Sequence, residues 1–271
     1  MSIYFSSQKG RRPTNEDGHT IKVFLNPENN KKKMFAKVNM YAIYDGHGGS
    51  TVSKYLASHL DYNFVKKTVQ YPLTKKYIVD VYNKVQSDLT EKCKHFAKQC
   101  GSTCLCVLHF KDNNGRYKIH VLNTGDSRAC MCNGNKAIRL TEDHKPGTIK
   151  ERERINKLGG KIVKDGSDYR IGNLSVSRSF GDNDTRPFIT HLPDMFTHTI
   201  TSKDRFLILA CDGLWDVMTD QNAINFILIN CYDKDGKRIK KKINIARQLA
   251  DFAINVLNST DNVSVIIVFF D

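Results

Sequence analysis

The sequence predicts an α+β protein in which a β-sheet core is flanked by long helices. Five apolar, β-branched runs are typical of buried strands, and four amphipathic segments are typical of helices whose apolar stripe needs a partner. The strands do not alternate regularly with the helices, which disfavours a doubly wound parallel sheet. Because the chain contains no internal repeat and no Pro/Gly/Ser-rich linker, we expect a single domain over residues 1–271.

The expected strands are runs rich in Val, Ile, Leu and aromatic residues, which suit a pleated, buried surface. The strongest candidates lie at residues 37–45, 101–110, 116–126, 204–212 and 262–271, and weaker ones lie at 3–6 and 19–25.

The expected helices show apolar residues at three- and four-residue steps. In the first helix, Val52, Tyr55, Leu56 and Leu60 would share one face. The four segments are 49 to about 70, 73–99, 220–231 and 242–257.

The eight cysteines do not suggest a disulfide framework. Cys104 and Cys106, and likewise Cys130 and Cys132, are two residues apart, which in a strand places both thiols on one face. A zinc site would more usually show C-x2-C spacing, which is absent. We therefore expect small, buried hydrophobic side chains, with zinc or redox chemistry as the alternative.

The net charge of +14 favours anionic partners such as phosphorylated protein, acidic lipid or nucleic acid. The basic runs at 31–33 and 237–242 are typical of solvated loops, with a nuclear-import or nucleic-acid patch as the alternative. No aromatic-interleaved RNA motif or zinc finger accompanies them, so we do not expect a nucleic-acid partner.

The sequence also gives no sign of a membrane partner. No apolar run reaches the ~20 residues that span a bilayer, and the N-terminus lacks the apolar stretch of a secretory signal. These features predict an intracellular protein, in the cytoplasm or the nucleus.

Four aspartates stand beside predicted strands. Asp45, Asp126 and Asp212 end apolar runs, and Asp261 comes just before the last one. A single acid at such a position is usually a turn or a helix cap. If the strand ends converge, however, the carboxylates would repel one another unless cations lay between them. Oxygen ligands without His or Cys clusters suit Mg²⁺ or Mn²⁺, and two such ions roughly 3.5–4 Å apart can activate water for attack on phosphorus.

Residues near the N-terminus and after Asp45 also suit phosphate chemistry. Arg12 could bind phosphate oxygens in a bidentate manner, with a surface salt bridge as the alternative. Glu16 and Asp17 follow it and add two acids. His47 could bind metal, donate a proton to a leaving oxygen, or make a structural hydrogen bond.

These residues lie in blocks that resemble the metal-dependent protein phosphatase family, the type 2C serine/threonine phosphatases. The resemblance covers nearly the whole chain. Its blocks are RRPTNEDGH (11–19), YDGHGG (44–49), GST (101–103), NTGDSRA (123–129), TEDHKPGTIKERERI (141–155), LSVSRSFGD (174–182), LACDGLWDV (209–217) and STDNVSVI (259–266). A lone DGHGG would be a weak signal, whereas eight blocks in family order are a strong one.

The resemblance implies a four-layer αββα sandwich, in which two mainly antiparallel β-sheets are flanked by pairs of helices. It also implies two Mg²⁺ or Mn²⁺ ions. Asp45 would bridge both ions, and the carbonyl of Gly46 would bind one of them. Asp212 and Asp261 would complete the shell of the first ion.

The resemblance assigns further acids to the surroundings of these ions. Glu16 and Asp17 would lie beside the second ion, where Glu16 would act largely through bound water. Asp143, together with Asp212, matches the position that can hold a weaker third ion. Asp126 and Asp216 would support the ligands without binding metal.

The implied activity is hydrolysis of phosphoserine and phosphothreonine in proteins by direct attack of a metal-bridging water or hydroxide. Arg12 would hold the phosphate, and His47 would protonate the leaving seryl or threonyl oxygen. A catalytically inactive phosphatase-like binding module is the alternative, and a nucleic-acid-binding protein is a more distant one. We expect a monomer that acts on phosphorylated proteins.

Two segments depart from the family pattern. The stretch at about 182–200, where the resemblance places a flap near the active site, is short and matches poorly, so substrate choice stays open. The insert at 23–39 adds a basic loop whose role the sequence does not assign.

Overall fold

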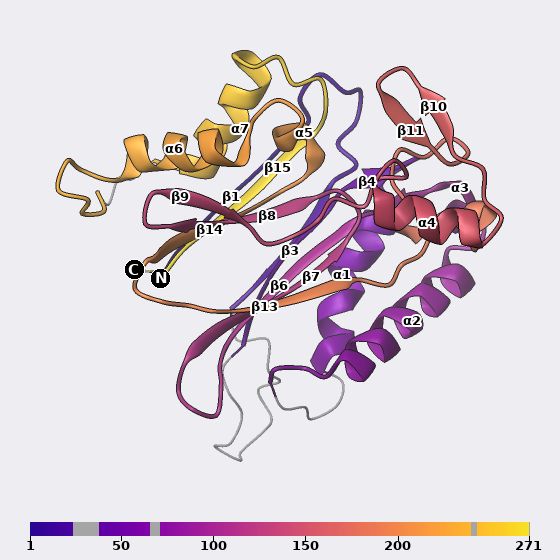
Figure 1. The fold of residues 1–271 in the computed structure, drawn as a ribbon, viewed down its shortest axis with the longest axis horizontal. Coiled ribbons are helices and arrows are strands. Elements are labelled where there is room, and N and C mark those ends of the chain that lie inside the picture. Colours follow the sequence, from indigo (N-terminus) through magenta and orange to yellow (C-terminus); the bar gives the residue numbers. More distant parts are fainter. Residues whose placement is uncertain (24–37, 66–70, 240–242, 271) are drawn as a thin grey trace.

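The computed structural model describes residues 1–23, 38–65, 71–239 and 243–270. Two five-stranded antiparallel sheets pack face to face, and helices cover the outer face of each sheet (Figure 1). The α+β class and the four-layer sandwich expected from the sequence are confirmed.

Within each sheet all neighbouring strands are antiparallel. The first sheet contains, in spatial order, β1 (Ser2–Gln8), β15 (Val263–Phe269), β14 (Asp204–Ala210), β8 (Arg128–Asn133) and β9 (Lys136–Arg139). The second sheet contains β13 (Asp194–Thr199), β7 (Tyr117–Thr124), β6 (Cys104–Lys111), β3 (Asn39–Tyr44) and β2 (Gly18–Lys22).

Alternate residues of the central strands enter different apolar layers, because successive side chains of a strand point to opposite faces. In β3, Met40, Ala42 and Tyr44 pack toward the helices, whereas Tyr41 and Ile43 pack between the two sheets. β14 and β15 alternate in the same way. Both faces of these strands are therefore buried, which explains their nearly continuous apolar sequences.

The long helices supply the outer layers. α1 (Thr51–Val65) and α2 (Lys75–Lys92) cover the second sheet, and α6 (Asp220–Cys231) and α7 (Ile245–Asn255) cover the first (Figure 1). Thr74 caps α2 by accepting a backbone hydrogen bond with its side chain, which satisfies one of the free N–H groups at the helix start.

The remaining elements are short. The helices are α3 (Phe96–Gln99), α4 (Ile149–Lys157), α5 (Asp212–Trp215) and the 3-10 turn η1 (Asn183–Thr185). A small sheet has the order β12 (Phe180–Gly181), β5 (Gly101–Ser102) and β4 (Gly46–His47), and β10 (Val163–Asp165) forms a hairpin with β11 (Asp168–Arg170).

Every expected strand and helix is present in the described residues, but sequence periodicity missed β8, β9, β13 and α4, as well as the very short elements β4, β10, β11, β12 and α5. The α4 segment is almost entirely polar, and it is held by a buried ion pair of Glu151 as well as by buried Ile155. The expected helix at 73–99 is divided into α2 and α3. Residues 66–70 of the first expected helix, the basic run 31–33, residues 240–242 of the second run and most of the 23–39 insert lie outside the described residues.

The paired cysteines are buried, as expected. Cys104 and Cys106 pack in the core beneath α1 and α2, and Cys130 and Cys132 pack in the core beneath α6 and α7. None of the eight cysteines, all of which lie in the described residues, forms a disulfide. The pairs therefore act as small hydrophobic side chains.

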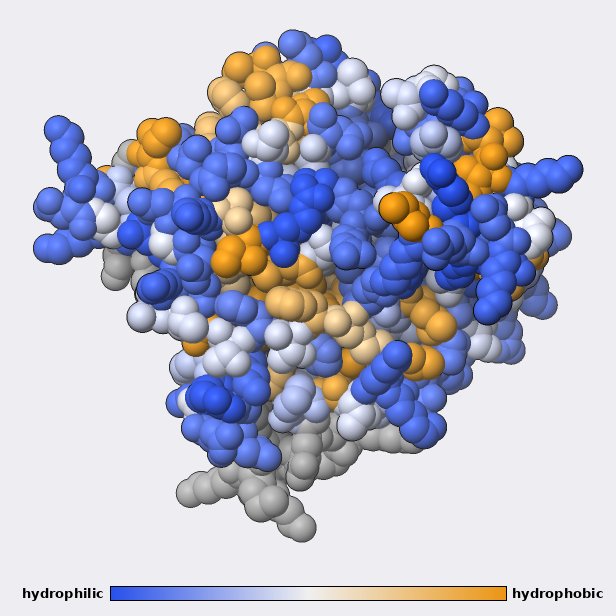
Figure 2. Space-filling view, viewed as in Figure 1, coloured by the Kyte–Doolittle hydropathy of each residue, from blue (hydrophilic) through white to orange (hydrophobic). Residues whose placement is uncertain are grey.

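The face seen in Figure 2 is mainly hydrophilic, in keeping with the strongly charged composition. Hydrophobic residues interrupt it near the middle of the view, where Figure 1 has the edge strands β9 and β13. Among the described residues, no helix has the length and apolar character to cross a bilayer.

Candidate active site

A pocket of about 370 Å³ opens at the end of the sandwich where acidic strand ends meet. The first residue of β2, Gly18, pairs with the last residue of β3, Tyr44, and Ala210 of β14 pairs with Val265 of β15. Asp45 follows β3, Asp212 follows β14, and Asp261 precedes β15. The antiparallel pairing therefore brings acids that are far apart in the sequence to one end of the fold. The pocket is lined by Arg12, Glu16, Asp45, Gly46, His47, Asp126, Asp212 and Asp261, together with ten other residues.

The carboxylates form two overlapping groups. Oxygen atoms of Asp45, Asp126 and Asp212 lie within 4.8 Å of one another, and so do ligand atoms of Asp17, Asp45 and Cys211. Burial and the neighbouring acids raise the pKa of Asp45 and of Asp212 well above the ordinary value. Burial is also the main reason that the pKa of Asp17 is raised to about 6. Too little positive charge lies near these crowded acids to stabilise their ionised forms.

The donor set fits hard divalent cations. Asp17 Oδ1 and Asp126 Oδ2 are buried and have no hydrogen-bond partner within the described part of the chain. A buried carboxylate oxygen without a partner is costly, and a cation would satisfy it. Oxygen ligands of this kind suit Mg²⁺ or Mn²⁺. Asp126, expected only as a support, lies as close to Asp45 and Asp212 as a ligand would.

Arg12 and Asp261 form an ion pair at the mouth of the pocket. Arg12 Nη2 donates to Asp261 Oδ2 at 2.6 Å, and the Arg12 side chain is 56% exposed. Such an exposed guanidinium is able to exchange this carboxylate for a phosphate group, which it binds by the same geometry.

Glu16, which also lines the pocket, is held by one hydrogen bond to its side chain and one from its own backbone. Its Oε2 accepts a hydrogen bond from Gly49 N at 2.9 Å, and its own N–H donates to Asn262 Oδ1 at 2.9 Å. A Cβ added to Gly46 would lie only 2.3 Å from the carbonyl oxygen of Glu16. The close approach of these two backbone segments requires glycine at position 46.

His47 is positioned by the small sheet. β4 carries His47, β12 ends next to Asp182, and β5 lies between them, so that His47 Nε2 is 2.8 Å from Asp182 Oδ2. A Cβ added to Gly101 would lie 2.0 Å from Asp182 Oδ2 and 2.3 Å from His47 Nε2. Burial alone would lower the pKa of His47, but the hydrogen bond and charge of Asp182 outweigh it and raise that pKa. Sequence reasoning missed Asp182, although it closes the SVSRSFGD block.

Asp143 does not join the cluster. Arg128 donates to both of its oxygens, from Nε to Oδ1 at 3.1 Å and from Nη2 to Oδ2 at 2.5 Å. Asp143 is not among the residues that line the pocket, and neither is Asp216, whose side chain is 63% exposed. The two positions that the resemblance placed near the ions therefore lie at the edge of the site or beyond it.

One wall of the pocket comes from residues 170–176 and not from the expected flap at about 182–200. The lining residues of this wall are Arg170, Asn173, Leu174, Ser175 and Val176. The 182–200 stretch instead contains η1 and edge strand β13, and none of its residues lines the pocket. The difference arises because β13 pairs with β7 along its whole length and so belongs to the second sheet.

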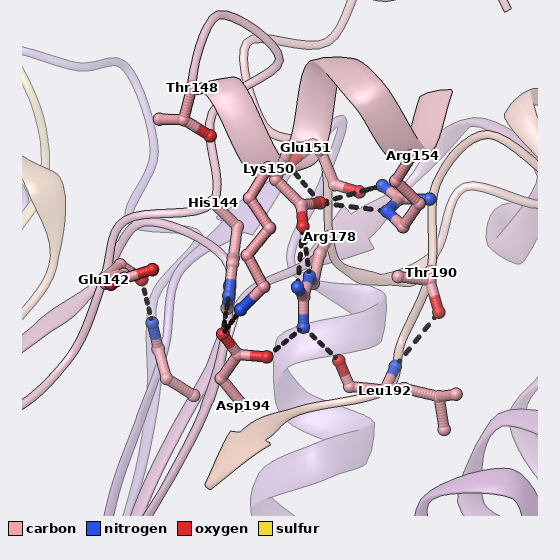
Figure 3. A network of polar contacts seen from close by, with 12 residues as sticks. Glu142, His144, Thr148, Lys150, Glu151, Arg154, Arg178, Thr190, Leu192 and Asp194 are labelled. Carbon is pink, nitrogen blue, oxygen red and sulfur yellow. Dashed lines mark hydrogen bonds and ion pairs between the residues drawn. The ribbon is translucent and has the colours of Figure 1, made fainter. Parts of the chain in front are cut away.

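A buried ion-pair network anchors α4, the helix before this wall (Figure 3). Arg178 Nη2 donates to Glu151 Oε1 at 2.6 Å, and Arg178 Nη1 donates to Asp194 Oδ1 at 2.8 Å. Arg154 donates to the other oxygen of Glu151 at 2.8 Å. Figure 3 shows Arg178 between the carboxylates of Glu151 and Asp194, so this guanidinium links α4 to β13.

Converging carboxylates beside an exposed arginine and a histidine–aspartate pair, at one end of an αββα sandwich, are typical of a metal-dependent phosphohydrolase. A model of the family "Protein phosphatase 2C" matches residues 1–263. The chain therefore belongs to the protein phosphatase 2C family, and the resemblance predicted from the sequence blocks is confirmed.

Two relatives and two solved structures illustrate the match. The chain is 35% identical over 293 residues to the integrin-linked kinase-associated serine/threonine phosphatase 2C of Mus musculus, covering 98% of this chain and 71% of that protein. It is 35% identical over 271 residues to "Probable protein phosphatase 2C 7" of Oryza sativa subsp. japonica, of which it spans 66%. A C. elegans sex determining protein superposes with a TM-score of 0.83 at 25% identity, over 100% of this chain and 65% of that one. A phosphatase from a pathogenic strain of Toxoplasma gondii shares the fold, with a TM-score of 0.80 at 23% identity, over 98% of this chain and 92% of that one.

The enzyme class expected from the sequence, a metal-dependent protein serine/threonine phosphatase, is confirmed at the level of the family. The inactive alternative would be favoured by the loss of a principal acid, but Asp45, Asp212 and Asp261 all line the pocket.

Proposed function

We propose that this chain hydrolyses phosphoserine and phosphothreonine in proteins with the help of two bound Mg²⁺ or Mn²⁺ ions. The observation that carries the proposal is the approach of Asp45, Asp126 and Asp212 within 4.8 Å at the floor of an open pocket. Asp45, the Gly46 carbonyl, Asp212 and Asp261 would hold the cations. When bound, the cations supply an activated water and positive charge that offsets the negative charge of the phosphoryl oxygens.

Glu16 and Asp17 act on the second side of the cluster. Glu16 is fixed by Gly49 N and faces the pocket, where it can orient water. Asp17 is more deeply buried, and its Oδ2 accepts a hydrogen bond from Ser264 Oγ at 2.6 Å. One Asp17 oxygen is thus fixed by the protein, and the other, Oδ1, has no hydrogen-bond partner among the described residues and would be satisfied by a cation.

Arg12 and His47 handle the substrate. Arg12 leaves Asp261 in part and holds the phosphoryl group by its planar N–H groups, which orients phosphorus for in-line attack. His47, whose protonated form is stabilised by Asp182, donates a proton to the seryl or threonyl oxygen as the bond to phosphorus breaks. A poor alkoxide leaving group needs this proton more than an aryl oxide does.

The test combines metal binding with hydrolysis of a phosphoserine peptide. We expect activity to require Mn²⁺ or Mg²⁺ and to stop with chelator. Asp45→Asn and Asp212→Asn should each remove several kcal/mol of transition-state stabilisation, on the order of 10³-fold in kcat/KM or more. Asp235→Asn, in an exposed turn, is the matched control and should behave as wild type.

The result that would overturn the proposal is equally direct. If calorimetry finds no tight divalent site, or if both cluster variants keep wild-type activity, these acids do not form the catalytic metal centre.

A further inference from the structure

Lys145 places an ammonium group at the outer edge of the carboxylate cluster. Its Nζ is 3.4 Å from Asp126 Oδ2 and 3.9 Å from Asp216 Oδ1. The first distance is that of an ion pair without hydrogen-bond geometry, so Asp126 Oδ2 stays without a hydrogen-bond partner among the described residues. Asp126 is 2% exposed and reaches Asp45 and Asp212 as well. Lys145 is therefore a positive charge built into the rim of the metal site.

Asp143, which the family resemblance assigns to a weaker third ion, is already paired with Arg128. Both oxygens of Asp143 accept hydrogen bonds from Arg128, whose side chain is only 10% exposed. Arg128 is fixed in turn by Asp220, at 2.6 Å from its Nη1. Withdrawing Asp143 to bind a cation would leave a buried guanidinium with half of its partners, which is costly. The residues present do not fit a third ion held by Asp143.

The backbone holds Lys145 in place. The N–H of His144 donates to the carbonyl of Gly125 at 3.0 Å, and the N–H of Gly125 donates to His144 Nδ1 at 3.1 Å. These two hydrogen bonds join Gly125, which precedes Asp126, to His144, which precedes Lys145. The N–H of Thr148 donates to the carbonyl of Lys145 at 3.0 Å and closes the following turn. The ammonium and the carboxylate therefore face each other as a consequence of the main-chain fold.

We propose that Lys145 occupies the charge-compensating place of a third cation between Asp126 and Asp216, and that it thereby weakens the binding of any additional divalent ion at this edge. The inference rests on the proposed function, because it presumes a metal centre at Asp45 and Asp212. A lysine side chain is an ammonium at neutral pH, and the Nζ of Lys145 lies between two carboxylates, 3.4 Å from Asp126 Oδ2 and 3.9 Å from Asp216 Oδ1. A fixed unit charge a few ångströms away repels a divalent ion and neutralises the acids that would attract it.

Calorimetric titration of the metal-free chain with Mn²⁺ tests the proposal without any measurement of catalysis. Lys145→Met removes the charge and keeps most of the length of the unbranched side chain. We expect its weakest Mn²⁺ site to bind about tenfold tighter than in wild type, after allowance for solvent screening. Lys157→Met removes the same charge from an exposed position on α4 and should leave every Mn²⁺ constant unchanged.

Two further variants keep the test decisive. Lys145→Arg preserves the charge and should keep the weakest site within about threefold of wild type. If Lys145→Met does not fold, Lys145→Gln is uncharged but keeps a polar end group, and it carries the same expectation. Unchanged Mn²⁺ constants in an uncharged variant, or equal tightening in the arginine variant, overturn the inference. If wild type shows no tight Mn²⁺ site at all, the proposed function fails instead.

Discussion

Replacing Glu151 with glutamine should destabilise the fold by about 2–3 kcal/mol at neutral pH, although the residue lies outside the metal cluster. Glu151 is 1% exposed and shares one oxygen with Arg178 and the other with Arg154. Burial alone would raise the pKa of Glu151, but the two arginines outweigh it and lower this pKa from 4.5 to about 2. A shift of this size corresponds to about 3 kcal/mol at most, and solvent screening reduces it. Glutamine keeps the shape and leaves Arg178 without half of its compensating charge.

The sign of the pH dependence follows from the lowered pKa. The unfolded chain holds Glu151 at its ordinary pKa, so the stabilisation is fully present above about pH 4.5 and is lost as the pH falls toward 2. Urea denaturation should therefore show a difference in the free energy of unfolding between wild type and Glu151→Gln that is largest at pH 7 and shrinks below pH 4.5.

The matched control is Glu153→Gln, which removes an exposed acid from the same helix and should change the stability by less than about 0.5 kcal/mol. The reasoning about the buried network would be refuted by a Glu151→Gln protein as stable as wild type at pH 7. A stability difference that does not diminish at acidic pH would refute only the electrostatic explanation of the effect.

Three other predictions concern the active site. Asp182→Asn should lower kcat by about 10- to 100-fold with little change in KM. The loss should be larger for a phosphoserine peptide than for an aryl phosphate, because only the alkoxide leaving group needs the proton of His47. Equal losses on both substrates would argue against this role. Saturating Mn²⁺ should raise the melting temperature by several degrees, since a ligand at 100 times its Kd stabilises by about 2.7 kcal/mol, and chelator should reverse the rise in a thermal scan. In chelator, Asp45→Asn should melt at or above the wild-type temperature, because burial and Asp212 raise the pKa of Asp45 and so make its ionised form unfavourable in the fold; a lower melting temperature would count against the crowding.

The sequence predicted the fold and the main acids because both depend on local patterns that repeat. Apolar strands buried on both faces stand out as continuous runs, and an acid directly after such a run, as at Asp45 and Asp212, is visible without coordinates. The antiparallel pairing of neighbouring strands then brings these acids to a common end of the sandwich. The order of the eight sequence blocks identified the family, which hydrophobic periodicity alone could not do.

The remaining features depend on partners that are distant in the sequence. The charge of Asp143 is neutralised by Arg128, and nothing near either residue signals that both oxygens are taken. α4 has too few apolar residues to show helical periodicity, because its buried face is held by the ion pair of Glu151 with Arg178. Asp182 meets His47 only through a sheet of two-residue strands, which are too short to leave a pattern.

The cluster is assembled across the boundary between the two sheets, since Asp45 follows β3 of one sheet and Asp212 follows β14 of the other. The apolar layer between the sheets, which includes Ile43 and Leu209, therefore sets the spacing of the Asp45 and Asp212 carboxylates. A methylene gained or lost in that layer moves one sheet relative to the other by fractions of an ångström, because interiors are close-packed. Side-chain volume deep inside the protein therefore matters to the acids at the end of the sandwich, because it helps to set the distance between their carboxylate oxygens.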